Sequence, residues 1–196
     1  MKKKIAVFDF DGTITTKDTL LEFIKFNKGS FAFYSGLLLN LPYLVAFKIK
    51  IISNQSAKEK VLKFFFHDTP LAVFKNNCVS FSKEILPGLI RKKALEEIKR
   101  LQGEGITVAI VSASPQDWIQ DWADEIGALL IASQLEIKNG KITGNLSGKN
   151  CHGNEKVRRI CETFDLSKYE VVAAYGDSSG DKPMLALAAQ SFYRPF

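Results

Sequence analysis

The most constraining stretch of the sequence is a short apolar run near the N-terminus that ends on two closely spaced aspartates. Ile5 to Phe8 is apolar and partly β-branched, which predicts a buried β-strand. Asp9 and Asp11 follow, and the alternation of side chains along an extended chain places both on one face at the carboxyl end of this strand. Gly12 then permits a sharp turn.

Two carboxylates this close together repel each other, and a divalent cation with oxygen ligands is a natural partner for both. An isolated Asp-x-Asp pair also occurs among solvated acids at the ends of strands, so the pair alone does not define a site. The remainder of the chain decides between these two interpretations.

From about residue 86 onward the sequence alternates between strand and helix patterns. We expect strands over 106–111, 129–132 and 170–175, and helices over 89–102, 114–126, 154–164 and 180–188. Ser114, just before Pro115, is interpreted as a helix N-cap, and Asn139-Gly140 predicts a hairpin within 135–144. The alternation predicts an α/β fold with a Rossmann-like, doubly wound parallel sheet, whose active site lies at the carboxyl ends of the strands.

The segment 15–82 has a different character, because it is apolar, basic and helical in pattern. It contains nine lysines, no arginine and four acids, so it carries +5 of the net charge of +6. We expect an all-helical cap here, with a capping box at Ser56, inserted into a core formed by 1–14 and 83–196. The positive charge predicts an anionic substrate or surface, and no basic run interleaved with aromatic residues indicates a nucleic-acid partner.

One part of this segment, 29–47, carries no charge and reaches the length of a membrane span. Gly29 is expected to end a helix over 16–28. Pro42 is expected to break a helix within 29–47, so we predict two short packed helices in this run. Contact with a membrane interface is the alternative, since Lys48 and Lys50 flank the run, but we do not expect a membrane partner.

Polar groups also follow the other predicted strands of the sheet. Ser112 and Ala113 follow the second strand, Asp177 and Asp181 follow a later one, and Lys156 lies in the first turn of a helix. Two carboxylate clusters, a hydroxyl near backbone N–H groups and one lysine are suited to holding a divalent metal and a phosphate group. The sequence therefore predicts a phosphate site with a metal at this edge of the sheet.

These residues resemble the four motifs of the haloacid dehalogenase superfamily of phosphatases. The matching stretches are Asp9-Phe10-Asp11-Gly12-Thr13, Val111-Ser112, Lys156 and Gly176-Asp177-x-x-x-Asp181. The helical segment between the first two motifs resembles the C1-type cap of the phosphoserine-phosphatase-like branch, subfamily IB. The resemblance extends from Lys4 to Pro195.

The resemblance implies a phosphomonoester hydrolase that depends on Mg²⁺ and forms an aspartyl-phosphate. Asp9 would be the nucleophile, and Asp11 would be the general acid and then the general base. The Mg²⁺ ligands would be Asp9, the backbone carbonyl of Asp11 and Asp177, with Asp181 and Gly12 in support.

The resemblance also assigns the residues that bind the phosphoryl group. Ser112, Ala113 and Lys156 would hold it, where positioning and charge compensation supply most of the rate.

The residues that recognise the rest of the substrate depart from the family pattern. Phosphoserine phosphatases of this branch use a glutamate shortly after the first motif and an arginine in the cap. The corresponding acid here is Asp18, and no arginine precedes Arg91. We expect Lys60 or Lys63 to replace the arginine as a point charge, and His152 to line the pocket.

The expected substrate is therefore a small or amphipathic organic phosphate ester, of which phosphoserine is one candidate. Gly180 stands where phosphoserine phosphatases usually carry asparagine. The apolar cap equally fits a lipid phosphate, as in the similar bacterial phosphatidylglycerophosphate phosphatases. Two further interpretations stay open, namely a phosphotransferase and a non-catalytic protein that binds phosphate groups or membranes.

The cysteines and the N-terminus bear on the compartment. Cys78, Cys151 and Cys161 show no paired spacing, which is typical of reduced thiols. The apolar run that follows the first lysines is too short for a secretory signal. We therefore expect a cytoplasmic protein.

Overall fold

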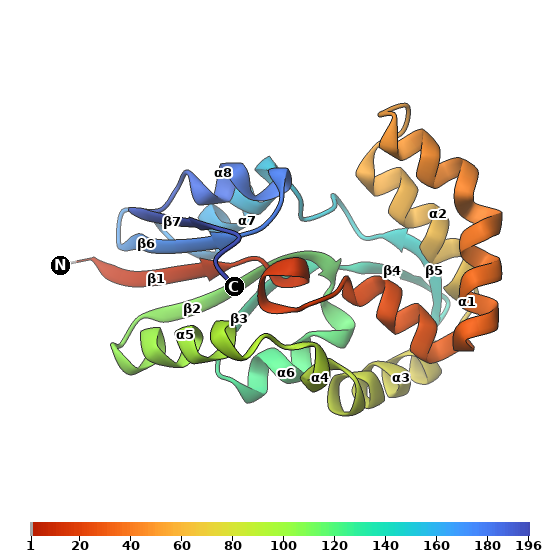
Figure 1. The fold of residues 1–196 in the computed structure, drawn as a ribbon, viewed down its shortest axis with the longest axis horizontal. Coiled ribbons are helices and arrows are strands. Elements are labelled where there is room, and N and C mark those ends of the chain that lie inside the picture. Colours follow the sequence, from red (N-terminus) through yellow and green to blue (C-terminus); the bar gives the residue numbers. More distant parts are fainter. Residues whose placement is uncertain (1) are drawn as a thin grey trace.

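Five parallel strands form the central sheet of the computed structural model, which describes residues 2–196 (Figure 1). The strands are β1 (Lys3–Phe8), β2 (Thr107–Pro115), β3 (Leu129–Ser133), β6 (Tyr169–Gly176) and β7 (Gln190–Tyr193), in the order β3-β2-β1-β6-β7. The sheet has β1 at its centre because its last four residues, Ile5 to Phe8, are fully buried and apolar.

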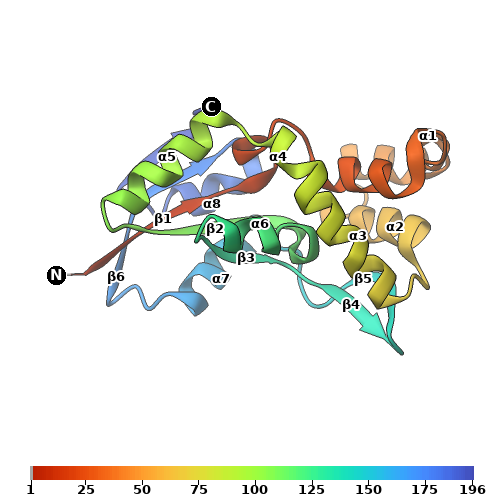
Figure 2. The same cartoon turned by 90° about the horizontal axis from the view of Figure 1, so that it is seen from below.

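Helices cover both faces of this sheet (Figures 1 and 2). Ile5 and Val7 of β1 belong to a core shared with α7 (Asn154–Thr163) and α8 (Lys182–Leu185), whereas Phe8 belongs to a second core. That second core includes side chains from α5 (Lys92–Gly103) and α6 (Gln120–Glu125). The alternation of strand side chains thus builds two apolar layers, and the predicted doubly wound α/β fold is confirmed.

Several predicted boundaries within the core were wrong. The second strand continues to Pro115 because its end pairs with β3, so no helix begins at Ser114 and only a short turn and α6 follow. The helix expected over 89–102 corresponds to α5, which begins only at Lys92, and a short helix, α4 (Leu86–Leu89), precedes it. The helix expected over 180–188 shortens to α8, and the edge strand β7 was not predicted.

The cap segment contains the helices α1 (Thr19–Lys48), α2 (Asn54–Phe66) and α3 (Leu71–Glu84). The expected break at Pro42 is absent, because the helix continues through it to Lys48. Pro42 and the residue four positions earlier, Leu38, are both exposed, so solvent can satisfy the carbonyl that the proline leaves without a donor. The helix direction changes instead at Gly29, whose φ of 77° and ψ of 163° are not helical.

The next helix also begins earlier than predicted, and it does not pack only against helices. Ser53, not Ser56, is the N-cap of α2, and its hydroxyl accepts from the Ser56 amide. The predicted hairpin is present as β4 (Leu135–Lys138) and β5 (Lys141–Leu146). It packs against α2, where the Leu146 amide donates to Glu59 at 3.1 Å, so a hairpin from the predicted core segment lies beside the helices of the cap.

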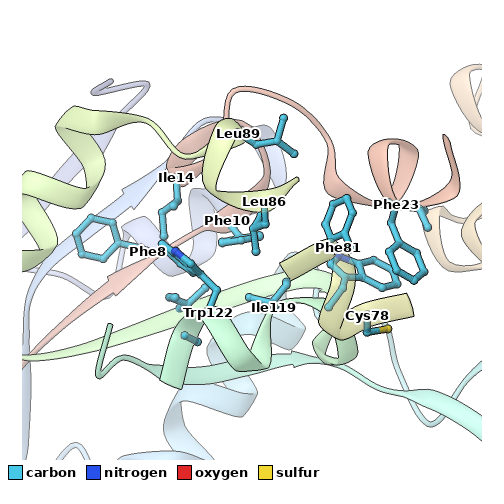
Figure 3. Close-up of a cluster of buried hydrophobic side chains, with 14 of the residues drawn as sticks. Phe8, Phe10, Ile14, Phe23, Cys78, Phe81, Leu86, Leu89, Ile119 and Trp122 are labelled. Carbon is cyan, nitrogen blue, oxygen red and sulfur yellow. The ribbon is translucent and has the colours of Figure 1, made fainter. Parts of the chain in front are cut away.

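Two crossing segments connect the core to the cap and lie side by side. Thr15 forms an isolated bridge with Ile90, and the Arg91 amide donates to the Ile14 carbonyl at 2.8 Å. Figure 3 shows the apolar cluster that continues from Phe8, Phe10 and Trp122 in the core to Phe23, Cys78 and Phe81 in the cap segment. We keep the division at 14/15 and 82/83 as a proposal, and the pairing of Thr15 with Ile90 supports its first boundary.

Candidate active site

A cavity of about 260 Å³ lies where the carboxyl ends of the core strands meet the cap. It is lined by Asp9, Asp11, Asp18, Leu20, Asn54, Lys58, Ala113, Ser114, His152, Lys156, Asp177, Ser178 and Asp181. Most of the predicted site residues therefore meet in one place, although they come from distant parts of the chain.

Lys156 at the start of α7 is the central cation of the cavity. Its Nζ donates to Asp9 Oδ1 at 2.5 Å and to Asp181 Oδ1 at 2.7 Å, and the residue is 1% exposed. Burial favours the neutral amine, but these two carboxylates raise the pKa of Lys156 well above its ordinary value. Burial likewise opposes ionisation of Asp181, yet Lys156 holds the pKa of that carboxyl below its usual range.

The acids around Lys156 outnumber it. Burial raises the pKa of Asp9 to about 7, and although Lys156 opposes this shift, the charges of Asp181 and Asp11 add to it. The pKa of Asp177 is also raised, by burial and by Asp181. Carboxylate oxygens of Asp9, Asp177 and Asp181 lie within 4.8 Å of one another. This set of hard oxygen donors with excess negative charge fits a divalent cation such as Mg²⁺.

The Asp11 carboxylate is held apart from that group of three. It accepts from the Thr19 amide at 2.7 Å, from Thr19 Oγ1 at 2.6 Å and from Ser114 Oγ at 2.6 Å. The interpretation of Ser114 as a helix cap was therefore wrong, since its hydroxyl orients Asp11 instead. Trp118 Nε1 donates to Thr19 Oγ1 at 3.1 Å and so supports this arrangement from behind.

Gly12 allows the first aspartate loop to approach the last one. Its φ is +83°, and a Cβ atom built on it would lie 2.5 Å from Asp177 Oδ2. Thr13 reinforces the same contact, because its hydroxyl is 3.2 Å from Asp9 Oδ2 and 3.4 Å from Asp177 Oδ1. Only a residue without a side chain fits this turn and this distance.

Ser112 and Ala113 occupy the expected strand end but differ in exposure. Ser112 is fully buried, accepts from the Ser114 amide at 3.0 Å and does not line the cavity. Ala113 does line the cavity, and its carbonyl accepts from Lys58 Nζ at 2.7 Å.

The cap contributes a different lysine from the two that were predicted. Lys58 and Asn54, one helical turn apart on α2, line the cavity, whereas Lys60 and Lys63 are exposed and do not. Lys60 Nζ lies 5.3 Å from the centre of the Tyr43 ring. The helix was predicted to begin at Ser56, so Asn54 and Lys58 were not recognised as lying one turn apart on the same helix. That spacing was the one signal in the sequence that could have identified Lys58.

Asp18 also lies at the cap side of the cavity, as predicted. Its carboxylate accepts from the Leu21 amide at 3.1 Å and so caps α1. Burial lowers the pKa of Lys58, although Asp11 and Asp18 oppose this shift. The two charged groups therefore share one side of the cavity.

His152 lines the cavity, as predicted, and it explains the glycine at position 180. A side chain at Gly180 would collide with the His152 ring. The departure from the asparagine of phosphoserine phosphatases is thus compensated by a neighbouring side chain. Burial, Lys156 and Lys58 together lower the pKa of His152, which favours the neutral imidazole.

A parallel α/β sheet with clustered aspartates and a buried lysine at its strand ends defines a class of enzymes that handle phosphate or similar anions with a metal. The model of the haloacid dehalogenase-like hydrolases matches residues 6–186, and the chain belongs to this family. It is 34% identical to protein CicA of Caulobacter vibrioides over 98% of this chain and 86% of that protein.

Phosphoserine phosphatases are similar in sequence and in fold. The enzyme of Methanocaldococcus jannaschii is 26% identical over 95% of this chain and 83% of its own length. A phospho-aspartyl intermediate analogue of phosphoserine phosphatase superposes with a TM-score of 0.67, at 22% identity, over 98% of this chain and 87% of that one. A Bordetella pertussis protein of unknown function has a TM-score of 0.84 at 19% identity, covering 98% and 90% of the two chains.

Proposed function

We propose that the enzyme is a Mg²⁺-dependent phosphomonoester hydrolase that works through an aspartyl-phosphate on Asp9. The observation that carries the proposal is the buried Lys156 ammonium between Asp9 and Asp181, beside Asp177 and beneath a lysine from the cap. The excess of carboxylates supports a metal at this position, and the cations support an anionic ligand.

The residues divide the reaction between them. An Asp9 oxygen attacks the phosphorus and the ester P–O bond breaks, while Asp11 gives its proton to the leaving alkoxide. In the second half, Asp11 removes a proton from water, which attacks the aspartyl-phosphate and releases inorganic phosphate and Asp9. The hydrogen bonds that Thr19 and Ser114 donate to the Asp11 carboxylate position it for both proton transfers.

Binding groups surround these two aspartates. Asp9, Asp177 and the backbone carbonyl of Asp11 would hold Mg²⁺, with Asp181 in support. When bound, the cation supplies charge compensation for the phosphoryl oxygens. Ala113 and Lys156, which line the cavity, would hold the phosphoryl group itself, and the buried Ser112 would position this strand end through its hydrogen bond from the Ser114 amide.

Release of phosphate from a panel of esters tests the function. The panel contains phosphoserine, sugar phosphates, nucleotides and a lipid phosphate, each with Mg²⁺ and with a chelator. We expect turnover that the chelator abolishes, and the preferred ester identifies what the cap recognises. A folded, metal-loaded protein that releases phosphate from none of these esters would contradict the proposal.

Mg²⁺ affinity is expected to increase with pH. The raised pKa of Asp9, about 7, means that a proton competes with the cation below neutrality. Between about pH 6 and about pH 8 the ionised fraction of such a group rises about tenfold, so the apparent affinity should rise by a similar factor. Titration calorimetry with Mg²⁺ at both pH values measures the affinity. The Asp9→Asn variant should bind Mg²⁺ weakly, and its affinity should depend little on pH. Equal affinity of the unaltered protein at both pH values would contradict the proposed metal ligand.

Lys58 is proposed to bind an anionic group of the substrate from the cap side. Lys58→Ala should raise KM by about tenfold to a hundredfold, the loss expected for a charge-assisted hydrogen bond. Because Lys58 touches no reacting atom, kcat should change less than KM. Lys60→Ala, on the exposed side of the same helix, is the matched control. An unchanged KM for Lys58→Ala would remove this residue from the substrate site.

A second candidate substrate class is a phosphate ester with an apolar part. Leu20 lines the cavity, and a long apolar segment of α1 leads into the cap helix that covers it. The lipid phosphate in the panel tests this class. Addition of acceptor alcohols separates hydrolysis from phosphotransfer, because a phosphotransferase would produce new phosphate esters.

We place the enzyme in the cytoplasm, in keeping with the free thiols of its three cysteines.

A further inference from the structure

The second half of α1 and the turn after it expose an unusually apolar surface. We call residues 30–51 the apolar arm. Phe31 is 90% exposed, Leu38 69%, Leu39 66% and Ile51 71%. Among the described residues, α1 is the one helix that is long and apolar enough to cross a membrane by length and composition. Such a continuous exposed apolar surface marks a binding site.

Packing within the protein uses only one side of the arm. Gly36 faces the Phe65 ring of α2, and Phe33 and Asn40 lie buried along the same side of the helix. The opposite side presents the exposed apolar residues Phe31, Tyr34, Leu38, Leu41 and Val45. A helix that is apolar all round is normally surrounded by protein or by lipid. Within residues 2–196, nothing therefore covers the outer side of the arm.

The charges around the arm indicate what that partner is. Lysines flank it at both ends and along α2: Lys25, Lys28, Lys48, Lys50 and Lys60. No acidic residue occurs between Glu22 and Glu59. An apolar surface bordered by lysines without acids complements an anionic lipid surface, where the lysines meet headgroups and the apolar side chains enter the interface.

The geometry favours a position in the interface over a span. The start of α1 is fixed to the core, because the Thr19 amide donates a hydrogen bond to Asp11 and Phe23 is fully buried. After the arm, α2 runs back alongside α1 (Figure 1). It carries Lys60 and Lys63 on its exposed surface, and such charges are costly within hydrocarbon.

We propose that the apolar arm docks this enzyme onto the surface of a bilayer rich in anionic lipid. The proposal goes beyond the hydrolase function and does not require it, since none of its residues takes part in the chemistry. Ile51 lies three residues before Asn54, which lines the cavity. Docking would therefore bring the substrate cavity close to the membrane surface.

Co-sedimentation with vesicles tests the docking. The full chain is mixed with vesicles of phosphatidylcholine and phosphatidylglycerol in equal parts, and with vesicles of phosphatidylcholine alone. We expect binding to the anionic vesicles, weakened by salt and by Lys48→Gln, and little binding to the neutral ones. The triple variant Phe31→Ser, Leu38→Ser, Leu39→Ser should lower vesicle partitioning by about a hundredfold.

Matched variants separate docking from unfolding and from catalysis. Val73→Ser, Leu129→Ser and Ile137→Ser remove three exposed apolar side chains elsewhere and should bind vesicles normally. The arm variant should keep its circular dichroism spectrum and its release of phosphate from a water-soluble ester. Asp9→Asn should still bind vesicles, so failure of the chemistry and failure of docking are distinguishable.

Two results would overturn the proposal. One is the absence of binding to anionic vesicles by the unaltered chain. The other is a dimer, detected by light scattering, that the arm variant converts to a monomer while vesicle binding is unchanged. That second outcome would assign the arm to a second copy of the chain.

Discussion

Asp9→Asn is expected to lower phosphate release by about ten-thousandfold or more, because it removes the only group proposed to attack phosphorus. Asparagine has the same shape and can still accept from Lys156 through its carbonyl oxygen, so the site should keep its arrangement. The raised pKa of Asp9 shows that its negative charge is costly when buried. We therefore expect the variant to be at least as stable as the unaltered protein without metal.

The measurement is release of inorganic phosphate from the ester that the panel identifies, together with thermal unfolding in chelator. Asp121→Asn, which changes an exposed acid on α6, is the control and should retain full activity. Residual turnover of Asp9→Asn within about tenfold of the unaltered enzyme would exclude an aspartyl-phosphate mechanism at this residue.

Lys156→Met is expected to damage both stability and activity. Without the ammonium, the buried carboxylates of Asp9 and Asp181 face each other uncompensated, and the loss should be about 3–5 kcal/mol of unfolding free energy without metal. Phosphate release should fall by about a hundredfold to a thousandfold, since a preorganised cation near the phosphoryl group is lost.

The direction of the pH effect follows from the pKa of Asp9. Burial raises the pKa of Asp9 to about 7, so this carboxylate takes up a proton when the pH falls from about 8 to about 5. Its repulsion with the Asp181 carboxylate then weakens. The stability difference between Lys156→Met and the unaltered protein should therefore be smaller at about pH 5 than at about pH 8.

Urea unfolding in chelator at both pH values measures this difference. Lys60→Met on the surface of α2 is the control, and Asp181→Asn added to Lys156→Met should restore part of the stability. A loss independent of pH and not relieved by Asp181→Asn would indicate a packing defect and contradict the electrostatic account.

The cavity lysine shows why part of the site was beyond sequence reasoning. Lys58, Lys60 and Lys63 have the same chemistry and lie within two turns of one helix. Which of them reaches the cavity depends on the rotation of α2 about its axis, and packing against α1 and β5 sets this rotation. The pattern predicted a cationic cap, but the two lysines named in that prediction, Lys60 and Lys63, do not line the cavity.

Contacts between residues that are distant in the sequence could not be predicted either. The contact between Ser114 and Asp11 joins two strand ends, and the fit of His152 to Gly180 joins two loops. Neither member of a pair carries a local pattern that points to the other. The same holds for the apolar arm. Its apolar composition is evident in the sequence, but only the fold shows that its outer side is exposed.

The sequence by itself determined the parallel α/β core and the strand ends where the aspartates and the lysine gather. These features follow from local periodicity, since a buried parallel strand must be continuously apolar and its end must present polar groups at one edge. The tertiary structure alone decided which groups touch, namely the Lys156 bridge, the orientation of Asp11 and the lysine of the cap. Contacts between distant segments arise from packing, which no local pattern encodes.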